Sequence, residues 1–321
     1  MKVFNFIKTI AKESKILVHL YGCFIGIIFL FSPISASKIL YRISTGKKLD
    51  LENPKGFNEK LMWLKHNWRD PVKTKCSDKL LVREFVKERG CEEILNEIYA
   101  VYDNIDEIDW SKLPHQFVLK CTYGSGANII CTNKDKLDIK KAKYILKKGL
   151  KIGFLNKTAE FHGDKSTNKI ICEKYIDTLQ GEVPIDYKVY CFNGKPKIVL
   201  AVKDRFKGLK KMFYDTEWNC LEQYANPKVC NGNIEKPENL DLIIFYAKKL
   251  SKGFPFVRAD FYSDGSRVVF GELTFTPAAC LSKAHNALGD AYFGELLKLP
   301  PKSIGKYREK RIYVHNKNIN N

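Results

Sequence analysis

A lysine followed by a loop of small residues occupies the stretch QFVLKCTYGSGANIIC, residues 116 to 131. Lys120 ends an apolar run, and Gly124, Ser125, Gly126 and Ala127 come shortly after it. A loop this poor in side chains lets backbone amides come close to a ligand, and anionic phosphate is the commonest such ligand. The same stretch also fits a plain β-hairpin that binds nothing. Both interpretations stay open at this point.

Two carboxylates lie in later strand-like runs of the chain. Asp260 belongs to VRADFY and Glu272 to FGELTF, and the turn Asp264-Gly265 predicts that these runs pair as a hairpin. Two facing carboxylates could share Mg²⁺, although acids on paired strands are more often solvated side chains. Arg258 is predicted on the same strand face as Asp260, where it could hold a transferring phosphate or a developing oxyanion.

Several familiar nucleotide sites are excluded. The loop after Lys120 lacks both the GK[ST] of a Walker motif and the GxGxxG of a dinucleotide fold. Protein kinases place their glycine loop before the strand lysine, whereas here the loop follows it, and the HRD and DFG motifs are absent.

The composition indicates a polyanionic partner. A formal net charge of +19 on 321 residues favours anionic lipid or acidic polysaccharide over nucleic acid, because no nucleic-acid-binding motif is visible. Free use of lysine by the genome is an alternative explanation for part of this charge. The ten cysteines are scattered without a CxxC pair. This pattern predicts a reducing cytoplasm and no structural metal site.

The apolar run Ile16–Phe31, interrupted only by His19, follows several lysines. It is short for a membrane span, and the SPISAS after it imitates a signal-peptide cleavage site. A buried helix of the fold is the alternative. We expect that the segment is retained and attaches the protein to the cytoplasmic side of a membrane, either by spanning it or by lying on it.

The body of the chain is expected to be α+β, because its hairpins and helices lack regular strand-helix alternation. Helices are predicted within residues 53–65, 76–90, 138–151 and 237–253. Strands are predicted at 116–121, 128–131, 169–176, 256–262 and 268–275, and a further pair surrounds a turn at Asn193-Gly194 within 186–204.

The order of these motifs resembles that of the ATP-grasp superfamily: strand lysine, small-residue loop, EKYI, DYK, RAD and ELTFTP. More narrowly, FNEKLMWLK, LPHQFVLKC, DYKVYCFNGKPKI, FYDTEWN and FGELTFTP resemble the TupA-like ATP-grasp family, over roughly Lys47 to Pro300. That family is named for teichuronopeptide synthesis, and its members occur among bacterial surface-polysaccharide genes. The resemblance implies an ATP-grasp fold with two lobes that grip the nucleotide, preceded here by an N-terminal hydrophobic helix.

The resemblance also implies roles for individual residues. Lys120 and the loop Gly124–Ala127 would contact the phosphates of ATP, and Asp260 and Glu272 would hold Mg²⁺. Thr274 stands where the wider superfamily usually has a metal-binding Asn, and Arg258 would steady the oxyanion. The other residues expected to contact the nucleotide are Lys79, Glu173, Lys174, Tyr175 and Lys188.

The expected reaction is that of a carboxylate-amine ligase, in which ATP phosphorylates a carboxylate and an amine attacks the acylphosphate. The expected substrates are a carboxylated or amino sugar of a surface polysaccharide, or its lipid-linked precursor, and an amino acid or other amine. A membrane-associated glycosyltransferase and a non-catalytic scaffold are the alternatives. The expected parts are a membrane-associated segment (1–45), a helical region (46–115), a small lobe (116–180), a large lobe (181–300) and a basic tail (301–321).

Overall fold

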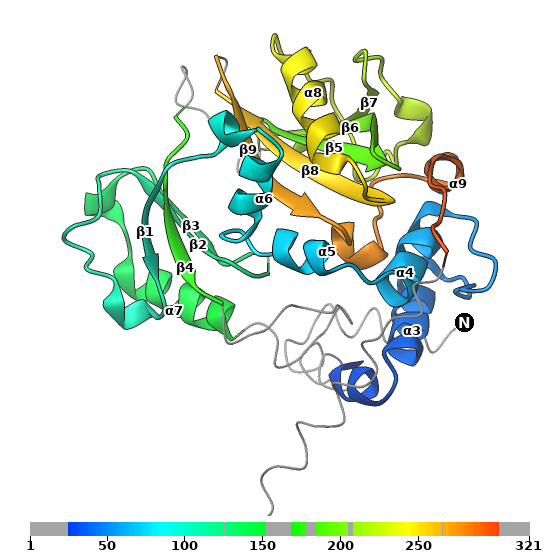
Figure 1. Ribbon diagram of the computed structural model, residues 1–321, viewed down its shortest axis with the longest axis horizontal. Helices are drawn as coiled ribbons and strands as arrows, with labels where there is room; N and C mark the ends of the chain where they lie inside the picture. Colours follow the sequence, from blue (N-terminus) through cyan, green and yellow to red (C-terminus); the bar gives the residue numbers. More distant parts are fainter. Residues whose placement is uncertain are drawn as a thin grey trace, which may run out of the picture.

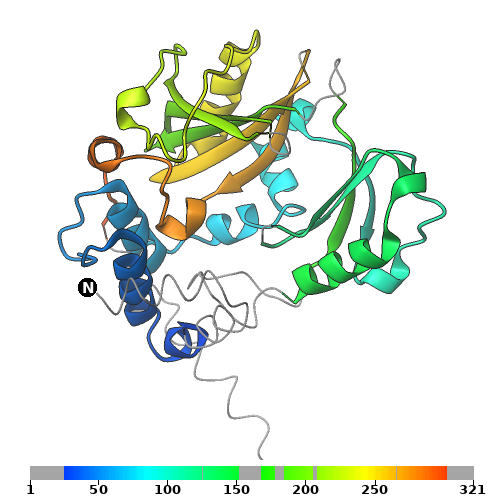
Figure 2. The same ribbon diagram turned by 180° about the vertical axis from the view of Figure 1, so that it is seen from behind.

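The computed structural model describes residues 25–124, 126–151, 168–177, 184–204, 208–264 and 266–301. Two antiparallel sheets stand on either side of the short helices α5 (Pro71–Cys76) and α6 (Val82–Glu88), as both Figure 1 and the view from behind in Figure 2 show. Each sheet has its own cluster of buried apolar side chains. The α+β class is confirmed, and the two sheets with separate cores form two lobes.

The smaller sheet has the strand order β1-β4-β2-β3. Its strands are β1 (Ile98–Tyr102), β2 (Phe117–Cys121), β3 (Asn128–Cys131) and β4 (Ile170–Lys174). Burial alternates along β2, so one face packs on α7 (Ile139–Leu150) while Val118 and Lys120 face the opposite way. Strand β1 was not predicted as a strand.

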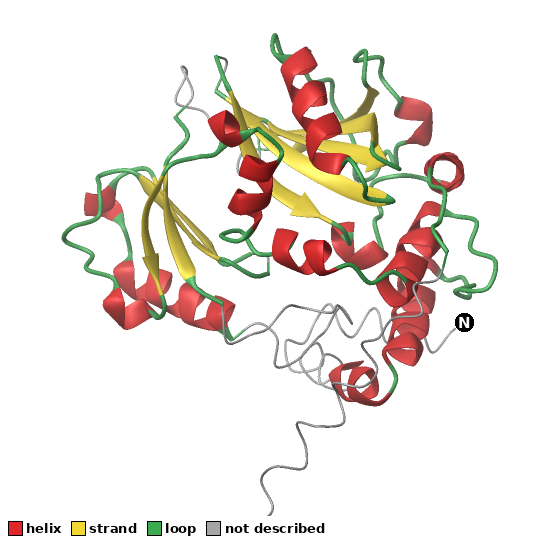
Figure 3. Cartoon of the chain, in the orientation of Figure 1, coloured by secondary structure: helices red, strands yellow, loops and turns green. Residues whose placement is uncertain are grey.

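The larger sheet has the order β7-β6-β5-β8-β9. Its strands are β5 (Asp186–Phe192), β6 (Lys195–Lys203), β7 (Lys210–Asp215), β8 (Phe256–Ser263) and β9 (Val268–Thr274), and α8 (Leu240–Ser251) lies against it (Figure 3). Asn193 and Gly194 join β5 to β6 and both have positive φ, 49° and 76°, as a tight hairpin turn requires. The predicted turn is therefore confirmed, whereas strand β7 was not predicted.

The helices before β1 differ from the prediction in one respect. Residues 76–90 do not form one helix, because α5 ends at Cys76 and α6 begins at Val82. Helix α4 (Phe57–Asn67) starts after Gly56, to whose amide Glu59 Oε2 lies 3.2 Å away. Asn58 therefore lies inside the helix and does not cap it.

Helix α4 packs against α9 (Ala287–Leu296), which lies near the other end of the described chain. Lys60 Nζ donates to the carbonyls of Gly294 and Leu297 at 2.7 and 2.8 Å. The Asn58 side chain exchanges two hydrogen bonds with the backbone of Ser282, both of 3.1 Å. Gly294 is required by this packing, since a Cβ there would lie 2.3 Å from the Lys55 carbonyl oxygen.

Of the predicted hydrophobic segment 16–31, residues 16–24 lie outside the described residues, and residues 25–31 are helical. Ile25 is buried against α3 (Pro33–Thr45), with Ile28 and Phe29 packed beside it. None of the helices in the described ranges is long and apolar enough to cross a membrane. The nine described cysteines are free, and all except Cys220 are buried, as expected of thiols used as small apolar side chains.

Candidate active site

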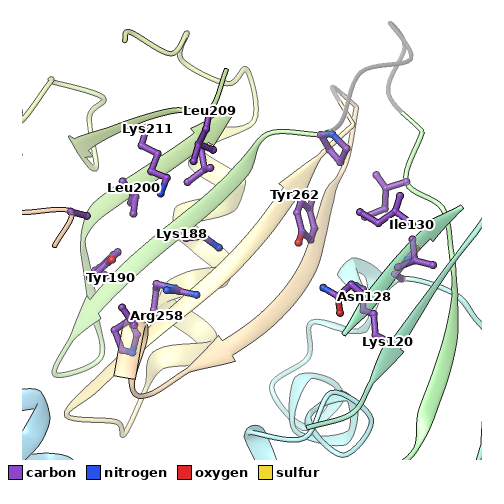
Figure 4. Close-up of a pocket in the computed structure, with 18 of the residues that line it drawn as sticks. Lys120, Asn128, Ile130, Lys188, Tyr190, Leu200, Leu209, Lys211, Arg258 and Tyr262 are labelled. Carbon is purple, nitrogen blue, oxygen red and sulfur yellow. The ribbon is translucent and has the colours of Figure 1, made fainter. Parts of the chain in front are cut away.

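A cavity of about 680 Å³ lies between the two sheets and is lined by residues of both lobes (Figure 4). Lys120, Asn128 and Ile130 come from the smaller sheet, and Lys188 and Arg258 from the larger one. The cavity therefore brings together segments that are separated by more than a hundred residues of sequence.

Lys120 reaches the cavity because it lies on the face of β2 that points away from α7. Its Nζ forms an ion pair of 2.7 Å with Oε2 of Glu173 on the neighbouring strand β4. The side chains are only 18% and 12% exposed. The family resemblance implied that each of these residues contacts the nucleotide, and the structure shows in addition that they form an ion pair with each other.

Lys79 holds the loop after β2 through hydrogen bonds to the loop backbone. The Lys79 ammonium donates to the Gly124 carbonyl at 2.8 Å, and its backbone N–H donates to the Thr122 carbonyl at 3.0 Å. Burial lowers the pKa of this lysine. Gly124 and Gly126 have φ of 82° and 87°, a region that favours glycine. Lys79 thus supports the loop in this structure and does not extend freely into the cavity.

The remaining loop residues differ in their placement. Ala127 is buried, and its Cβ lies only 2.4 Å from where a Cβ on Gly149 of α7 would be. Its small size is therefore explained by close packing against α7, and it does not line the cavity. Ser125 lies outside the described residues.

Glu173, Lys174 and Tyr175 all line the cavity at the end of β4. The Lys174 N–H donates to the Glu97 carbonyl at 2.9 Å, and its carbonyl accepts from Asn96 Nδ2 at 2.8 Å. The segment before β1 therefore already uses the backbone groups of Lys174, one of the residues expected to contact the nucleotide. Sequence reasoning missed this contact because β1 itself was not predicted.

The buried acid of the site is Asp260, with 3% of its surface exposed. Arg258 donates to both of its oxygens, from Nε and from a terminal nitrogen, at 2.6 Å each. Lys188 Nζ donates to Asp260 Oδ2 at 2.6 Å and lies 2.7 Å from Asp186 Oδ2. Burial alone raises the pKa of Asp260, but Arg258 and Lys188 outweigh burial and hold its pKa below the usual range.

Asp186 is a site residue that the sequence analysis missed. It lies two positions before Lys188 in DYK, so strand periodicity places both on one face of β5. Lys188 is thereby held between Asp186 and Asp260, which stands opposite it on β8. That spacing was the signal that could have revealed it.

Glu272 stands opposite Asp260 in the β8–β9 ladder, as predicted. Thr274 Oγ1 donates to Glu272 Oε1 at 3.0 Å and accepts from Arg258 at 3.1 Å. Glu272 is more accessible than Asp260, with 39% of its side chain exposed, and lies 3.5 Å from the Arg258 guanidinium. Burial lowers the pKa of Arg258, but the Asp260 carboxylate raises it further, so that the pKa lies above its ordinary value.

The oxygen donors of Asp260, Glu272 and Thr274 are of the kind that Mg²⁺ prefers, and they lie beside Arg258, which lines the cavity. The described residues hold no group of three or more His, Cys, Asp or Glu side chains arranged to bind a metal. Mg²⁺ does not need such a cage, because it keeps several waters and is commonly bound by one or two carboxylates together with substrate phosphates. Asp260 and Glu272 supply two carboxylates, and Thr274 supplies a hydroxyl beside them.

The cavity continues past Arg258 along the larger sheet. This end is formed by Tyr190 and Leu200 in the sheet, by Val229 beyond β7, and by Ser282 and Ala284 after β9. Two lysines, Lys211 and Lys283, also line it. None of these residues was predicted as a site residue.

A sequence model described as TupA-like ATPgrasp matches residues 59–298. The chain belongs to the TupA-like ATP-grasp family. The resemblance read from the motifs is thereby confirmed over most of its predicted extent.

Similar solved structures are ATP-grasp ligases. One is the ATP-grasp ligase PsnB complexed with minimal precursor, at 10% identity and a TM-score of 0.38, covering 70% of this chain and 60% of that one. Another is the D-alanine–D-alanine ligase from Bacillus anthracis complexed with ATP, at 15% identity and a TM-score of 0.41, covering 77% and 68%. The chain thus spans less than two thirds of the length of PsnB. No curated protein matches the chain.

Proposed function

We propose that the protein is an ATP-dependent carboxylate-amine ligase that acts on a component of a bacterial surface polysaccharide. Membership of an ATP-grasp family supports the ATP-dependent part of this proposal. The observation that carries it in the structure is the shared cavity, because Lys120 of one lobe and Lys188 and Arg258 of the other line the same space. Their charges suit a polyphosphate that lies between the lobes.

The base of the nucleotide would lie at the end of β4, beside Tyr175 and Ile176. Its phosphates would then extend towards Lys120 and Lys188. Both lysines are already paired with carboxylates, so each ammonium exchanges part of that contact for phosphate oxygens when the nucleotide binds. Mg²⁺, when bound, would be held by Asp260 and Glu272 beside Thr274, where it neutralises phosphate charge.

The chemistry proposed for this site is a two-step condensation. A substrate carboxylate oxygen attacks the γ-phosphorus, which yields an acylphosphate and ADP. The amine then attacks the acyl carbon, and phosphate leaves with the original carboxylate oxygen as the amide forms and the amine loses a proton. Arg258 is fixed by Asp260 and Thr274, so its positive charge is already oriented when negative charge develops on the acyl oxygen.

The test is an ADP-release assay with the purified full-length chain. Uronic acids are supplied as carboxylates and amino acids as amines, singly and together, with ATP and Mg²⁺. We expect ADP release that requires both substrates, with no release by Glu272→Gln. Release of a free nucleotide from a sugar nucleotide, without ATP consumption, would instead identify a glycosyltransferase. Consumption of neither would indicate a scaffold.

We further propose that the chain is attached to the cytoplasmic face of the membrane through residues 16–31. Apolar side chains at and just after the end of this segment are exposed: Ile27 (54%), Leu30 (80%), Phe31 (87%) and Ile34 (44%). A protein with a net charge of +19 is attracted to anionic lipid, which complements the burial of these side chains in the bilayer. Use of ATP requires the catalytic lobes to stay in the cytoplasm.

A further inference from the structure

The cationic residues of the cavity fall into two groups according to whether a carboxylate neutralises them. Lys120 is paired with Glu173, and Lys188 is held by two aspartates. Within the described ranges, neither Lys211 nor Lys283 forms an ion pair with a carboxylate, although both line the cavity. The end of the cavity away from the smaller lobe therefore carries positive charge that the described protein groups do not balance.

One segment, residues 225–231, is hydrogen-bonded to the backbone beside both lysines. The Lys211 N–H donates to the Asn231 carbonyl at 3.2 Å. At the other end of the segment, Asn226 donates from its backbone to Ala284 at 2.7 Å and from its side chain to the carbonyl of Lys283 at 2.9 Å. The backbone at both lysines is thus joined to the same segment, and Val229, which lies between the two contacts in the sequence, also lines the cavity.

Strand register places Lys211 relative to the proposed reaction centre. Lys211 stands opposite Val202 on β6, and Lys188 stands opposite Leu200 on the same strand. Figure 4 shows the Lys211 side chain pointing along the sheet towards Leu200, on the side away from the smaller lobe. Strands β7, β6 and β5 are consecutive in the sheet and about 4.8 Å apart, so the backbones of Lys211 and Lys188 are separated by two strand spacings, roughly 10 Å, and by two residues along the strands.

We propose that Lys211 and Lys283 form a second anion subsite, which binds a phosphate of the acceptor while its carboxylate lies at Arg258. This inference rests on the proposed ligase function and names its substrate class: a carboxylated sugar that also carries a phosphate at the far side of its ring. Lysine ammonium groups suit phosphate as point charges, and the apolar Leu200 and Val229 beneath would contact the ring between the two anions.

The test compares two probes on protein saturated with Mg²⁺ and a non-hydrolysable ATP analogue. Glucuronic acid 1-phosphate carries both anions, whereas glucuronic acid carries only the carboxylate, and calorimetry measures the Kd of each. We expect the phosphorylated probe to bind at least about 10-fold more tightly. In the double variant Lys211→Gln/Lys283→Gln, the two Kd values should agree to within about 2-fold.

Lys210→Gln is the matched control, because Lys210 precedes Lys211 on β7, points to the opposite sheet face and lies 3.8 Å from Asp204. This variant should keep the full preference for the phosphorylated probe. Equal binding of the two probes, binding of neither, or a preference that survives in the double variant would each overturn the subsite. ADP release is measured separately with both probes plus amino acids. Absence of release with a retained binding preference would reject the ligase function and leave the anion subsite standing.

Discussion

Substitution of the two site carboxylates should have different effects on stability but the same effect on turnover. Asp260 is buried and accepts three hydrogen bonds of 2.6 Å from Arg258 and Lys188. In Asp260→Asn, the amide nitrogen has to face one of these cations, and both cations lose the charge that compensates them. Breaking a buried ion pair by removing one partner typically costs 3–5 kcal/mol. Because Asn keeps the shape and one acceptor, we expect the lower limit, about 3 kcal/mol.

Glu272 offers the matched comparison. Its side chain is 39% exposed, and its ion-pair contact with Arg258 is longer, at 3.5 Å. Glu272→Gln should therefore change the free energy of unfolding by less than about 1 kcal/mol. Both variants should lose ATP turnover, since each removes a proposed metal ligand.

Thermal unfolding and ADP release measure the two effects separately. With roughly 2–4 °C of Tm per kcal/mol for chains of 150–250 residues, Asp260→Asn should lower Tm by about 5–10 °C in this longer chain. Glu272→Gln should unfold within about 2 °C of wild type. Wild-type Tm in Asp260→Asn would show that the buried ion pairs do not form in the free protein. Wild-type turnover in either variant would remove that residue from the proposed metal site.

The pH dependence of stability gives an independent measure of the same contacts. Burial raises the pKa of Asp260, but Arg258 and Lys188 lower it further, so its pKa in the folded protein is below the ordinary value. The unfolded chain then takes up a proton that the folded chain does not bind. The stability contributed by this group is complete above the unfolded pKa of about 4 and is lost as the pH falls through the folded value. Asp260→Asn should flatten the urea-denaturation profile in that acidic window, whereas an unchanged slope would contradict the assignment.

Three further outcomes are expected. Lys120→Ala should weaken ATP binding measured by calorimetry. Gly126→Val should also weaken it, because φ of 87° strains any β-branched residue, and Gly126→Asn should have a smaller effect. Unchanged Kd values for ATP would favour a β-hairpin that binds no ligand. Leu30→Asp/Phe31→Asp should keep wild-type Tm, since both side chains are exposed, but should reduce co-sedimentation with anionic vesicles several-fold; undiminished sedimentation would reject this attachment. Burial, together with nearby cations, lowers the pKa of His66 to about 3. The free energy of unfolding should therefore fall as the pH is lowered from about 6.5. His66→Asn should remove this part of the pH dependence, measured by denaturant titration.

Local periodicity was enough to predict much of the site. Alternation along one strand correctly placed Arg258 and Asp260 on the same face, and the predicted hairpin correctly paired Asp260 with Glu272. The motif order also led to the family, which the match over residues 59–298 confirms.

The pairing between distant strands could not be read in this way. Lys188 meets Asp260 because β5 lies beside β8, and no local pattern states which strands become neighbours. The sequence therefore indicated separate phosphate and metal residues, whereas the structure shows one buried network of charges. Lys120 and Glu173 became partners for the same reason, through the pairing of β2 with β4.

The end of the cavity that carries Lys211 and Lys283 was not predicted, because strand β7 was not predicted. Lys210 and Lys211 begin β7, and alternation requires adjacent residues to point to opposite faces without stating which one faces a cavity. Only the contact of β7 with β6 decides that Lys211 shares a face with Val202. Lys283 lies in an irregular segment, where no periodicity applies.

The packing of α4 against α9 also affects when the cavity is completed during synthesis of the chain. The hydrogen bond from the backbone N–H of Asn58 to Oδ1 of Asp290 joins residues 232 positions apart, so it closes a loop that contains both sheets. Closing so long a loop is entropically costly, and contacts of such large sequence separation slow folding. During synthesis on the ribosome the smaller lobe is complete early, because strands β1 to β4 end at Lys174. The segment that carries Ser282 and Lys283 can contact Asn58 only after that segment has left the exit tunnel. The part of the cavity lined by Ser282 and Lys283 is therefore the last to assemble, and a nascent chain can hold a folded smaller lobe before the cavity is complete.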